Sequence, residues 1–316
     1  MKNELRIGFM GTPDFAVPSL EALLNNGFAV PVVVTAPDRP AGRGRKLKSS
    51  PVKQFAQDHN IPVLQPERLK DPAFAEELRQ YGVNLIVVVA FRMLPKEIWA
   101  LPEHGTFNLH ASLLPDYRGA APINWAVING ETTTGVTTFF IDEKIDTGNI
   151  LLQESTEIGP GETAGALHDR LMNLGARLVV DTVDWISSGQ AMAIPQKQAD
   201  PAKHAPKLER ENTRISWGAP RMAIFNKIRG LNPYPAAWTE LENHGTVSLL
   251  KVYRSEFSDL TEPGIPGQIK VLGRKWHVCA GDGWMELLEI QLPGKRRMAV
   301  SDALNGLELD KNARLL

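Results

Sequence analysis

Cysteine is almost absent from this sequence of 316 residues, since Cys279 is the single example. One cysteine excludes a disulfide framework and a zinc site built from several thiolates, and it is typical of a reducing compartment. Long hydrophobic runs are missing too, because the longest, from Leu85 to Phe91, is far shorter than the ~20 residues of a membrane helix. The apolar stretch from Ile7 to Met10 is too short for a secretory signal. We therefore expect a cytoplasmic protein without a membrane partner.

An excess of charge of one sign is also lacking. The chain has 35 Lys and Arg against 36 Asp and Glu, so its net charge is −1 and a globally basic nucleic-acid-binding field is excluded. The balance differs along the chain: 19 basic against 23 acidic residues up to residue 205 (net −4), and 16 against 13 thereafter (net +3). The carboxy-terminal part is thus mildly basic.

The length and composition indicate two domains. A chain of 316 residues with 43% hydrophobic side chains is long enough for two separate cores. Residues 190–206 are polar, contain three prolines and lack periodicity, which is typical of a linker. We therefore predict an amino-terminal domain over residues 1–189, a linker over 190–206 and a carboxy-terminal domain over 207–316.

Short apolar runs alternate with helical stretches through the first of these domains. The predicted strands are Leu5–Met10, Val30–Thr35, Leu85–Ala90, Phe107–His110 and Val136–Ile141. The predicted helices are Pro18–Asn25, Ser50–His59, Asp71–Tyr81, Ala120–Asn129 and Glu162–Ser188. Almost continuously apolar strands are buried on both faces. The pattern predicts an α/β fold with an open, mostly parallel, twisted sheet and helices on both faces, similar to a Rossmann fold.

Residues 207–316 follow a different pattern. One short helix, about 219–231, precedes the predicted strands Val247–Arg254, Gly267–Leu272, Lys275–Ala280 and Trp284–Leu292. Several short strands at this spacing predict a small β-barrel. Five aromatic residues are expected in its core rather than on a base-stacking surface: Trp217, Tyr234, Trp238, Trp276 and Trp284.

The turn after the first strand argues against a dinucleotide cofactor. Gly11-Thr12-Pro13 stands where a G-x-G-x-x-G fingerprint would be, and Pro13 removes a backbone donor that a pyrophosphate would use. A nicotinamide or flavin cofactor is therefore not expected. A ligand carboxylate or phosphate at the following helix start remains open.

Two polar side chains share one face of a predicted strand. Asn108 and His110 point to one side of residues 106–111, while Phe107 and Leu109 point to the other. Polar groups near the carboxyl end of a buried parallel strand are costly unless they are satisfied or used, and ligands bind at such ends. The two are therefore either candidate catalytic groups or hydrogen-bonded core residues.

The segments that follow supply a loop and a carboxylate. Residues 112–122 are dense in turn-forming residues and lead into a helix, which predicts a shaped loop at the end of the strand. About thirty residues later, a further strand ends in the segment Asp142–Gly148. Asp146 in this segment either faces His110 or is an ordinary loop residue.

These residues carry a family resemblance. The sequence His110-Ala-Ser-Leu-Leu-Pro-Asp-Tyr-Arg-Gly-Ala-Ala-Pro122, with Asn108 before it and Asp146-Thr-Gly148 after it, resembles the signature of formyltransferases that use formyl-tetrahydrofolate. The segments Gly11–Phe15 and Ala36–Leu47 resemble the methionyl-tRNA formyltransferase family in particular. The likeness extends over the amino-terminal domain, the linker and the barrel, which it implies is an OB-fold-like tRNA-binding domain.

The resemblance implies the site residues. Asn108, His110 and Asp146 correspond to the catalytic residues of the family, and its folate-contact positions fall on a second set: Phe91, Ser112, Leu113, Leu114 and Pro115. The donor it implies is 10-formyltetrahydrofolate, without a metal. Arg92 is a departure, because the family commonly has glycine there, and this puts the local backbone next to Phe91 in question.

A cluster of cations suggests where tRNA binds. Arg39, Arg43, Arg45 and Lys46 crowd into one loop, which Gly42 and Gly44 are expected to make flexible. Taken alone, the cluster is compatible with a solvated surface loop, whereas the resemblance implies that it contacts the tRNA acceptor stem. Further candidates for phosphate contacts lie in the barrel: Lys207, Arg210, Arg214, Arg221, Lys227, Arg229 and Lys295 to Arg297.

The implied reaction transfers a formyl group to the α-amine of methionine on initiator methionyl-tRNA, by a protein expected to be a monomer. Asn108 and protonated His110 would stabilise the developing oxyanion, and Asp146 would assist His110 and accept a proton. The alternatives are a formyltransferase acting on an amino-sugar or glycinamide ribonucleotide, a hydrolase that releases formate, and a non-catalytic tRNA- or folate-binding protein.

Overall fold

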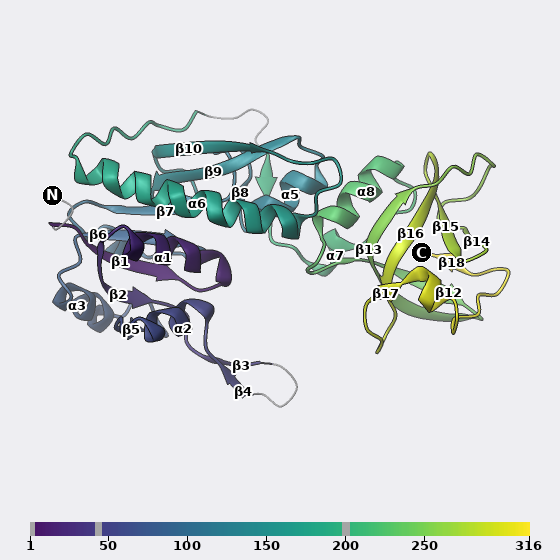
Figure 1. Cartoon of the computed structure of the whole chain (residues 1–316), viewed down its shortest axis with the longest axis horizontal. Helices are drawn as coiled ribbons and strands as arrows, with labels where there is room; N and C mark the ends of the chain where they lie inside the picture. The colour runs from purple at the N-terminus through teal and green to yellow at the C-terminus, as the bar shows by residue number, and fades with distance from the viewer. Residues whose placement is uncertain (1–3, 42–45, 198–202) are drawn as a thin grey trace. The chain divides into compact units, whose positions relative to one another are not determined.

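The computed structural model describes residues 4–41, 46–197 and 203–316 (Figure 1). The backbone forms two compact units. The first comprises residues 1–119, 133–157 and 168–204, and the second comprises residues 120–132, 158–167 and 205–316. The second unit therefore includes two segments from inside the predicted amino-terminal domain, and the linear domain boundaries proposed above stay a prediction.

The first unit is built on a seven-stranded sheet. Its order is β10-β9-β7-β6-β1-β2-β5. The strands are β1 (Arg6–Gly11), β2 (Ala29–Val34), β5 (Val63–Leu64), β6 (Leu85–Val89), β7 (Thr106–His110), β9 (Thr133–Phe140) and β10 (Ile150–Glu157). The five strands from β7 to β5 are parallel, whereas β9 runs antiparallel to both of its neighbours, β7 and β10. The predicted open, mostly parallel sheet is confirmed.

Helices cover both faces of this sheet. On one face α3 (Pro72–Gln80) and α4 (Lys96–Trp99) contribute Phe74, Leu78 and Ile98 to a core that contains Met10 and Val88. On the other face α6 (Ala164–Ser187) packs against β9, where the hydroxyls of Thr182 and Thr138 lie 2.8 Å apart. The remaining helical segments are η2 (Asp14–Ala16), α1 (Val17–Asn25) and α2 (Pro51–Asp58). None of the helices in the described part is long and apolar enough to cross a membrane.

Strand β10 was not among the predicted strands. Its burial alternates along ILLQESTE, with the polar residues Gln153, Ser155 and Glu157 more exposed than most of their neighbours. An edge strand that is half solvated lacks the continuous apolar run by which the inner strands were found. The flexibility expected of the basic loop concerns residues 42–45, which lie outside the described residues. The segments on either side pair as the antiparallel strands β3 (Arg39–Ala41) and β4 (Lys46–Lys48) (Figure 1).

The second unit contains the antiparallel barrel. Its strand order is β14-β15-β16-β13-β12-β18, with β17 beside β16. The strands are β12 (Ala237–Asn243), β13 (Thr246–Phe257), β14 (Ile269–Leu272), β15 (Lys275–Ala280), β16 (Gly283–Gln291), β17 (Met298–Ala299) and β18 (Arg314–Leu315). A bridge between Gln268 and Arg314 connects the two outer strands and nearly closes the sheet. Gly267 sits at this closure with φ +84°, and a Cβ there would lie 2.0 Å from the Leu315 carbonyl oxygen. The expected OB-fold-like barrel is confirmed.

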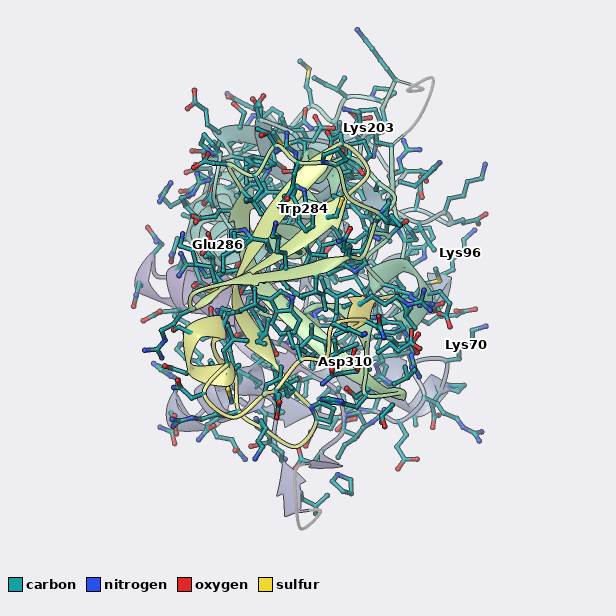
Figure 2. All side chains as sticks on the ribbon, turned by 90° about the vertical axis from the view of Figure 1, so that its right-hand side faces the viewer. Lys70, Lys96, Lys203, Trp284, Glu286 and Asp310 are labelled. Atoms are coloured by element: carbon teal, nitrogen blue, oxygen red, sulfur yellow. The ribbon has the colours of Figure 1, made fainter. Side chains whose placement is uncertain are left out.

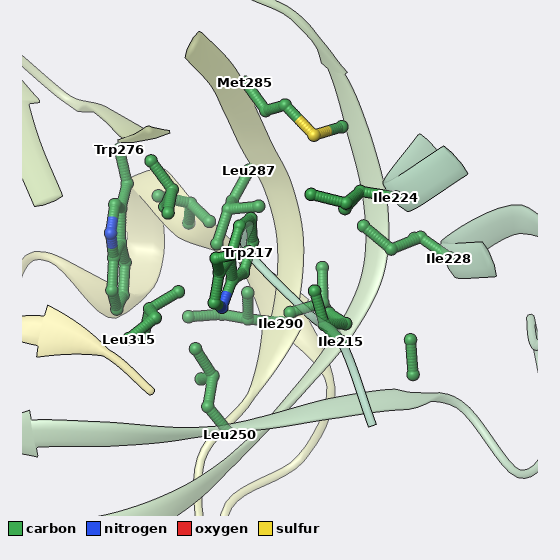
Figure 3. Close-up of a cluster of buried hydrophobic side chains, with 14 of the residues drawn as sticks. Ile215, Trp217, Ile224, Ile228, Leu250, Trp276, Met285, Leu287, Ile290 and Leu315 are labelled. Carbon is green, nitrogen blue, oxygen red and sulfur yellow. The ribbon is translucent and has the colours of Figure 1, made fainter. Parts of the chain in front are cut away.

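The core of the barrel is apolar and fully buried. Figure 3 shows Trp217, Leu287 and Ile290 meeting between the strands, with Trp276 beside them. Trp284 and Glu286, labelled in Figure 2, come from strand β16. Of the five aromatic residues expected in the core, the four tryptophans are buried. The expectation was wrong for Tyr234, which is 82% exposed because it stands between Pro233 and Pro235 in the turn that leads from α8 to β12.

Short helices pack beside the barrel strands in the second unit. Helix α5 (Pro122–Ile128) contacts α8 (Arg221–Gly230), where the Asn124 amide donates to the Gly230 carbonyl at 2.8 Å. The others are α7 (Arg210–Thr213) and α9 (Val300–Ala303). Two short strands complete the assignment, β8 (Arg118–Gly119) and β11 (His204–Ala205).

Candidate active site

Strand β7 presents Asn108 and His110 on one face of the sheet. Asn108 is half-buried and pairs in register with Val88, so it faces the same side as helices α3 and α4. Phe107 and Leu109 point to the other side and are buried. The alternation predicted for this segment is confirmed, and it places both polar side chains near the carboxyl end of a central strand.

The imidazole of His110 is held between two groups. Its Nε2 lies 2.9 Å from the backbone oxygen of Tyr117, and its Nδ1 lies 3.8 Å from Oδ2 of Asp146. Because a carbonyl oxygen only accepts, Nε2 carries a hydrogen, and Nδ1 is the nitrogen that faces the Asp146 carboxylate. His110 is only 6% exposed, so water has little access to the contact between its ring and the Asp146 carboxylate.

The loop that carries Asp146 begins at the opposite end of strand β7 from His110. Strand β9 runs antiparallel to β7, so its last residue, Phe140, pairs with Phe107, while His110 pairs with Thr137. The two pairs are three residue steps apart along the strand, which is about 10 Å. The chain after β9 must therefore fold back along the sheet to bring Asp146 to His110.

Several backbone features hold Asp146 there. Its φ is +54°, an unusual value for a residue with a Cβ. Its Oδ2 accepts a hydrogen bond from the Gly119 backbone nitrogen at 2.9 Å. Two residues further on, a Cβ on Gly148 would lie 1.6 Å from the Phe140 carbonyl oxygen, so only glycine fits this tight return. The alternative that Asp146 is an ordinary loop residue does not account for this arrangement.

Asn108 has an amide group that is available to a ligand. No residue of the described ranges forms a hydrogen bond with its side chain. A half-buried amide without an internal partner is costly unless water or a ligand completes its hydrogen bonds. Asn108, His110 and Asp146 thus form a small polar cluster that includes a free hydrogen-bond donor.

The four residues from Ser112 to Pro115 form the adjoining wall. Ser112 is buried, and its hydroxyl donates to the Asp116 carbonyl at 2.6 Å, so the side chain shapes the loop from inside. The Leu114 backbone N–H donates to Thr137 Oγ1, and the Leu114 carbonyl accepts from the Gln153 side-chain amide. Leu113 and Pro115 are half-buried and remain accessible to a ligand.

Phe91 lies on a segment whose backbone does not need glycine. The positive φ value in this stretch belongs to Ala90 (+48°), and Arg92 has an ordinary backbone conformation. The Arg92 guanidinium lies 5.3 Å from the Phe91 ring centroid and donates to the carbonyls of Pro66 and Glu67. Burial, together with the nearby Arg39, lowers the pKa of Arg92. The departure at this position therefore adds a positive charge beside Phe91.

The predicted tRNA contacts are placed only in part. Arg39 is exposed on β3, and Lys46 belongs to β4, whereas Arg43 and Arg45 lie outside the described residues. Two barrel candidates are used internally. The Lys227 ammonium donates to the carbonyls of Asn212 and Arg214, and Arg229 is 7% exposed. Burial lowers the pKa of both side chains. The exposed barrel candidates include Lys207, Arg210, Lys295 and Arg296.

The sequence analysis missed the groups that hold the candidate catalytic side chains. These are the Tyr117 carbonyl, the Gly119 backbone nitrogen, Arg118 and Gln196. Backbone groups carry no residue-specific signal, and Gln196 lies in a segment that was assigned as a linker. In the described ranges, no group of three or more His, Cys, Asp or Glu side chains is arranged to hold a metal ion.

The chain belongs to the formyl transferase family. Residues 5–183 match the family described as "Formyl transferase", and residues 207–308 match "Formyl transferase, C-terminal domain". Relatives with high sequence identity define the kind of formyltransferase more narrowly than the family does. A methionyl-tRNA formyltransferase of Bacteroides fragilis is 49% identical over 98% of this chain and 97% of its own length. One from Flavobacterium johnsoniae is 49% identical over 99% of both chains.

Solved structures with lower sequence identity share the fold. An N-formyltransferase from Helicobacter canadensis, crystallised with folinic acid and dTDP-3-aminofucose, has a TM-score of 0.65 at 22% identity and covers 90% of this chain and 98% of its own. Glycinamide ribonucleotide transformylase 1 from Symbiobacterium toebii has a TM-score of 0.53 at 21% identity, covering 61% and 94%. At these identities the likeness concerns the fold alone.

Proposed function

We propose that this protein transfers the formyl group of 10-formyltetrahydrofolate to the α-amino group of methionine on initiator methionyl-tRNA. The observation that carries the proposal is that the Asn108 amide and the His110–Asp146 pair lie on one face of the sheet near the carboxyl end of β7. The near-full-length relatives named above support the choice of acceptor. We place the reaction in the cytoplasm and expect a monomer.

The chemistry requires a neutral amine and a place for negative charge. An α-amine with a pKa of about 7.7–8.0 is roughly one-tenth neutral at pH 7, so no strong base is needed to produce the nucleophile. The amine nitrogen attacks the formyl carbon, and the carbonyl electrons move onto the oxygen. The attacking nitrogen then loses a proton, folate N10 gains one, and the bond from carbon to N10 breaks. Donor and acceptor exchange one formyl group without net consumption of protons.

Each member of the cluster has a role in these steps. The Asn108 amide donates to the formyl oxygen as it becomes negative. His110, with Nε2 occupied by Tyr117, acts through Nδ1 and adds positive charge to the same region when it is protonated. Asp146 stabilises that cation and relays the proton from the attacking amine to N10.

Folate is assigned to a surface of the first unit, and tRNA is assigned to basic residues of the first unit and of the barrel. Folate would lie along Leu113 and Pro115, with Phe91 against its ring system and Ser112 and Leu114 supporting the wall from inside. Phosphates of the tRNA would meet the basic residues Arg39, Arg43, Arg45 and Lys46 and the exposed cations of the barrel.

A direct assay tests the proposal. Purified protein and 10-formyltetrahydrofolate are incubated with initiator methionyl-tRNA, elongator methionyl-tRNA, an amino-sugar nucleotide, glycinamide ribonucleotide or no acceptor. We expect formyl-methionine to appear with the initiator and to be much reduced with the elongator. Faster transfer to either small acceptor, or formate release without an acceptor, would support the corresponding rival instead. Binding of tRNA or folate without turnover would indicate a non-catalytic protein.

A further inference from the structure

The segment predicted to be a linker is attached to the edge of the first sheet before it leaves the first unit. Ile194 and Ile150 exchange two backbone hydrogen bonds, each 2.8 Å long, at the beginning of β10. Gln196 follows two residues later and is half-buried. Because Ile150 closes the loop that contains Asp146, this pairing brings Gln196 against that loop.

The Gln196 side chain connects three backbone and side-chain groups of the site. Its Nε2 donates to the carbonyl oxygens of Asp146 and Gly148, at 3.0 and 2.8 Å. Its Oε1 accepts from the Arg118 guanidinium, with Nε at 3.2 Å and a second contact from the terminal nitrogen. This pattern fixes the orientation of the amide, because the nitrogen must face carbonyls and the oxygen must face a cation. Polarisation of the amide by Arg118 strengthens its donation to the loop.

A second residue from the same segment supports the other side of His110. The Tyr117 backbone nitrogen donates to the Lys203 carbonyl at 2.7 Å, and the Tyr117 carbonyl in turn accepts from His110 Nε2. Tyr117 and Asp146 both have positive φ values, +60° and +54°. Such conformations persist only where the surroundings hold them. Both backbone positions that flank His110 are thus held by residues 196 and 203.

We propose that Gln196 is a positioning residue for formyl transfer. Through its two hydrogen bonds to the 146–148 backbone, and with Arg118 orienting its amide, it keeps the Asp146 carboxylate in front of His110 Nδ1. The segment expected to serve only as a linker therefore forms part of the active-site support. The proposal rests on the proposed function for its kinetic test, and it has a separate structural test that requires no activity.

The kinetic test replaces Gln196 by a residue of similar length whose side chain lacks both the amide nitrogen and the amide oxygen. In Gln196→Met we expect kcat for methionyl-tRNA to fall about 10- to 100-fold, the usual consequence of a misplaced catalytic group. The KM values for tRNA and folate should change less than threefold, because Gln196 is not assigned to either substrate. Gln190→Met is the matched control, since Gln190 is exposed on the same segment. A kcat within twofold of the control, or a loss confined to KM, would overturn the proposal.

Gln196→Glu separates the two ends of the amide. At neutral pH its carboxylate keeps the contact with Arg118 but cannot donate to the Asp146 and Gly148 carbonyls, so we expect kcat to be as low as in Gln196→Met. Protonation at lower pH restores one donor, so the deficit relative to wild type should shrink as pH falls. The deficit of Gln196→Met should not change with pH. Normal activity of Gln196→Glu at neutral pH would mean that only the Arg118 contact matters, contrary to the proposal.

Amide hydrogen exchange gives the structural test. The Gly119 backbone N–H donates to the Asp146 carboxylate, so its protection reports whether Asp146 stays in place. We expect its exchange to accelerate at least tenfold in Gln196→Met, with the amides of β6 and β7 unchanged. Unchanged exchange at Gly119 would overturn the positioning role even if kcat falls. Should wild type fail to formylate methionyl-tRNA while this exchange result holds, the proposed function fails and the positioning of Asp146 by Gln196 stands.

Discussion

At the scale of single residues, Asn108 has the most specific expected effect. Its amide has no partner in the described part of the chain, so replacing it does not break an internal hydrogen bond. If it donates to the formyl oxygen, Asn108→Ala should lower kcat about 10²–10³-fold, the usual consequence of losing one oxyanion donor. Steady-state kinetics with saturating folate and methionyl-tRNA measure this effect.

Two controls accompany that substitution: the stability of Asn108→Ala in urea, and the activity of a variant at a distant asparagine. The urea midpoint of Asn108→Ala should stay close to that of wild type, since no native contact of the amide is lost. Asn173→Ala removes an exposed asparagine of α6 and should leave kcat unchanged. A near-normal kcat in Asn108→Ala would remove this residue from the proposed mechanism.

Ala236 is a second residue whose conformation leads to a prediction. It is buried, and its φ of +73° lies in the region that favours glycine. A left-handed conformation costs an L-residue about 1–2 kcal/mol, and the greater freedom of glycine in the unfolded chain offsets about 0.4–1 kcal/mol of this. We expect Ala236→Gly to raise the free energy of unfolding by up to about 1 kcal/mol.

The neighbouring alanine is the matched control for this experiment. Ala237 is fully buried in β12 and has an extended conformation, so Ala237→Gly should destabilise the protein by about 1 kcal/mol. Urea unfolding of the two variants measures the difference. Equal destabilisation by both glycines would show that the backbone at position 236 is not strained.

At the scale of elements, the pairing of β15 with β16 makes stability depend on pH. His277 is buried, its Nδ1 lies 2.9 Å from the Ser258 hydroxyl, and it pairs in register with Glu286. Burial lowers the pKa of His277, although the Glu286 carboxylate offsets part of this effect. The folded protein therefore binds a proton at His277 less readily than the unfolded chain does.

The sign of the effect follows from linkage. Below the unfolded histidine pKa of about 6.5, the unfolded state takes up more protons than the folded state, so the free energy of unfolding falls as pH decreases through this value. Above about pH 7 the contribution of His277 should be constant. Urea unfolding between pH 5 and 7.5 should show a smaller decline for His277→Gln than for wild type. Parallel declines would exclude His277 as the responsible group.

The elements also indicate how far the sequence can be interpreted. The inner strands β1 and β6 were predictable because they are buried on both faces and therefore almost continuously apolar, whereas β7 was predicted from the alternation of its polar and apolar residues. The edge strand β10 was not, because half of its side chains face solvent. The direction of β9 was beyond prediction as well, since an apolar run has the same pattern in a parallel and an antiparallel strand.

At the scale of the whole molecule, we expect the binding of tRNA and of folate to differ in their dependence on salt. The chain is nearly neutral, yet it has exposed cations such as Arg39, Lys207 and Arg296, which are proposed to contact tRNA phosphates. With three phosphate contacts, KM for methionyl-tRNA should rise about 20- to 40-fold between 50 and 200 mM salt, because condensed counterions are released on binding. KM for folate should change less than twofold over the same range.

A substitution among the clustered basic residues 39–46 tests where this salt dependence arises. Arg43→Ala should raise KM for tRNA and flatten its salt dependence, with the folate KM unchanged. Lys70→Ala removes an exposed cation elsewhere on the first unit and serves as the control. Equal salt dependence of both substrates would contradict separate binding surfaces for folate and tRNA.

The sequence by itself determined the class of fold, the polar face of β7 and the residue types of the candidate catalytic set. These follow from periodicity and from motifs in which neighbours in the chain are also neighbours in space. Only the tertiary structure decided how Asp146 reaches His110, which imidazole nitrogen faces Asp146, and that the Gln196 amide bonds to the backbone of the Asp146 loop. Those outcomes depend on strand direction and on backbone carbonyls brought together from distant segments, and no local pattern of side chains encodes them.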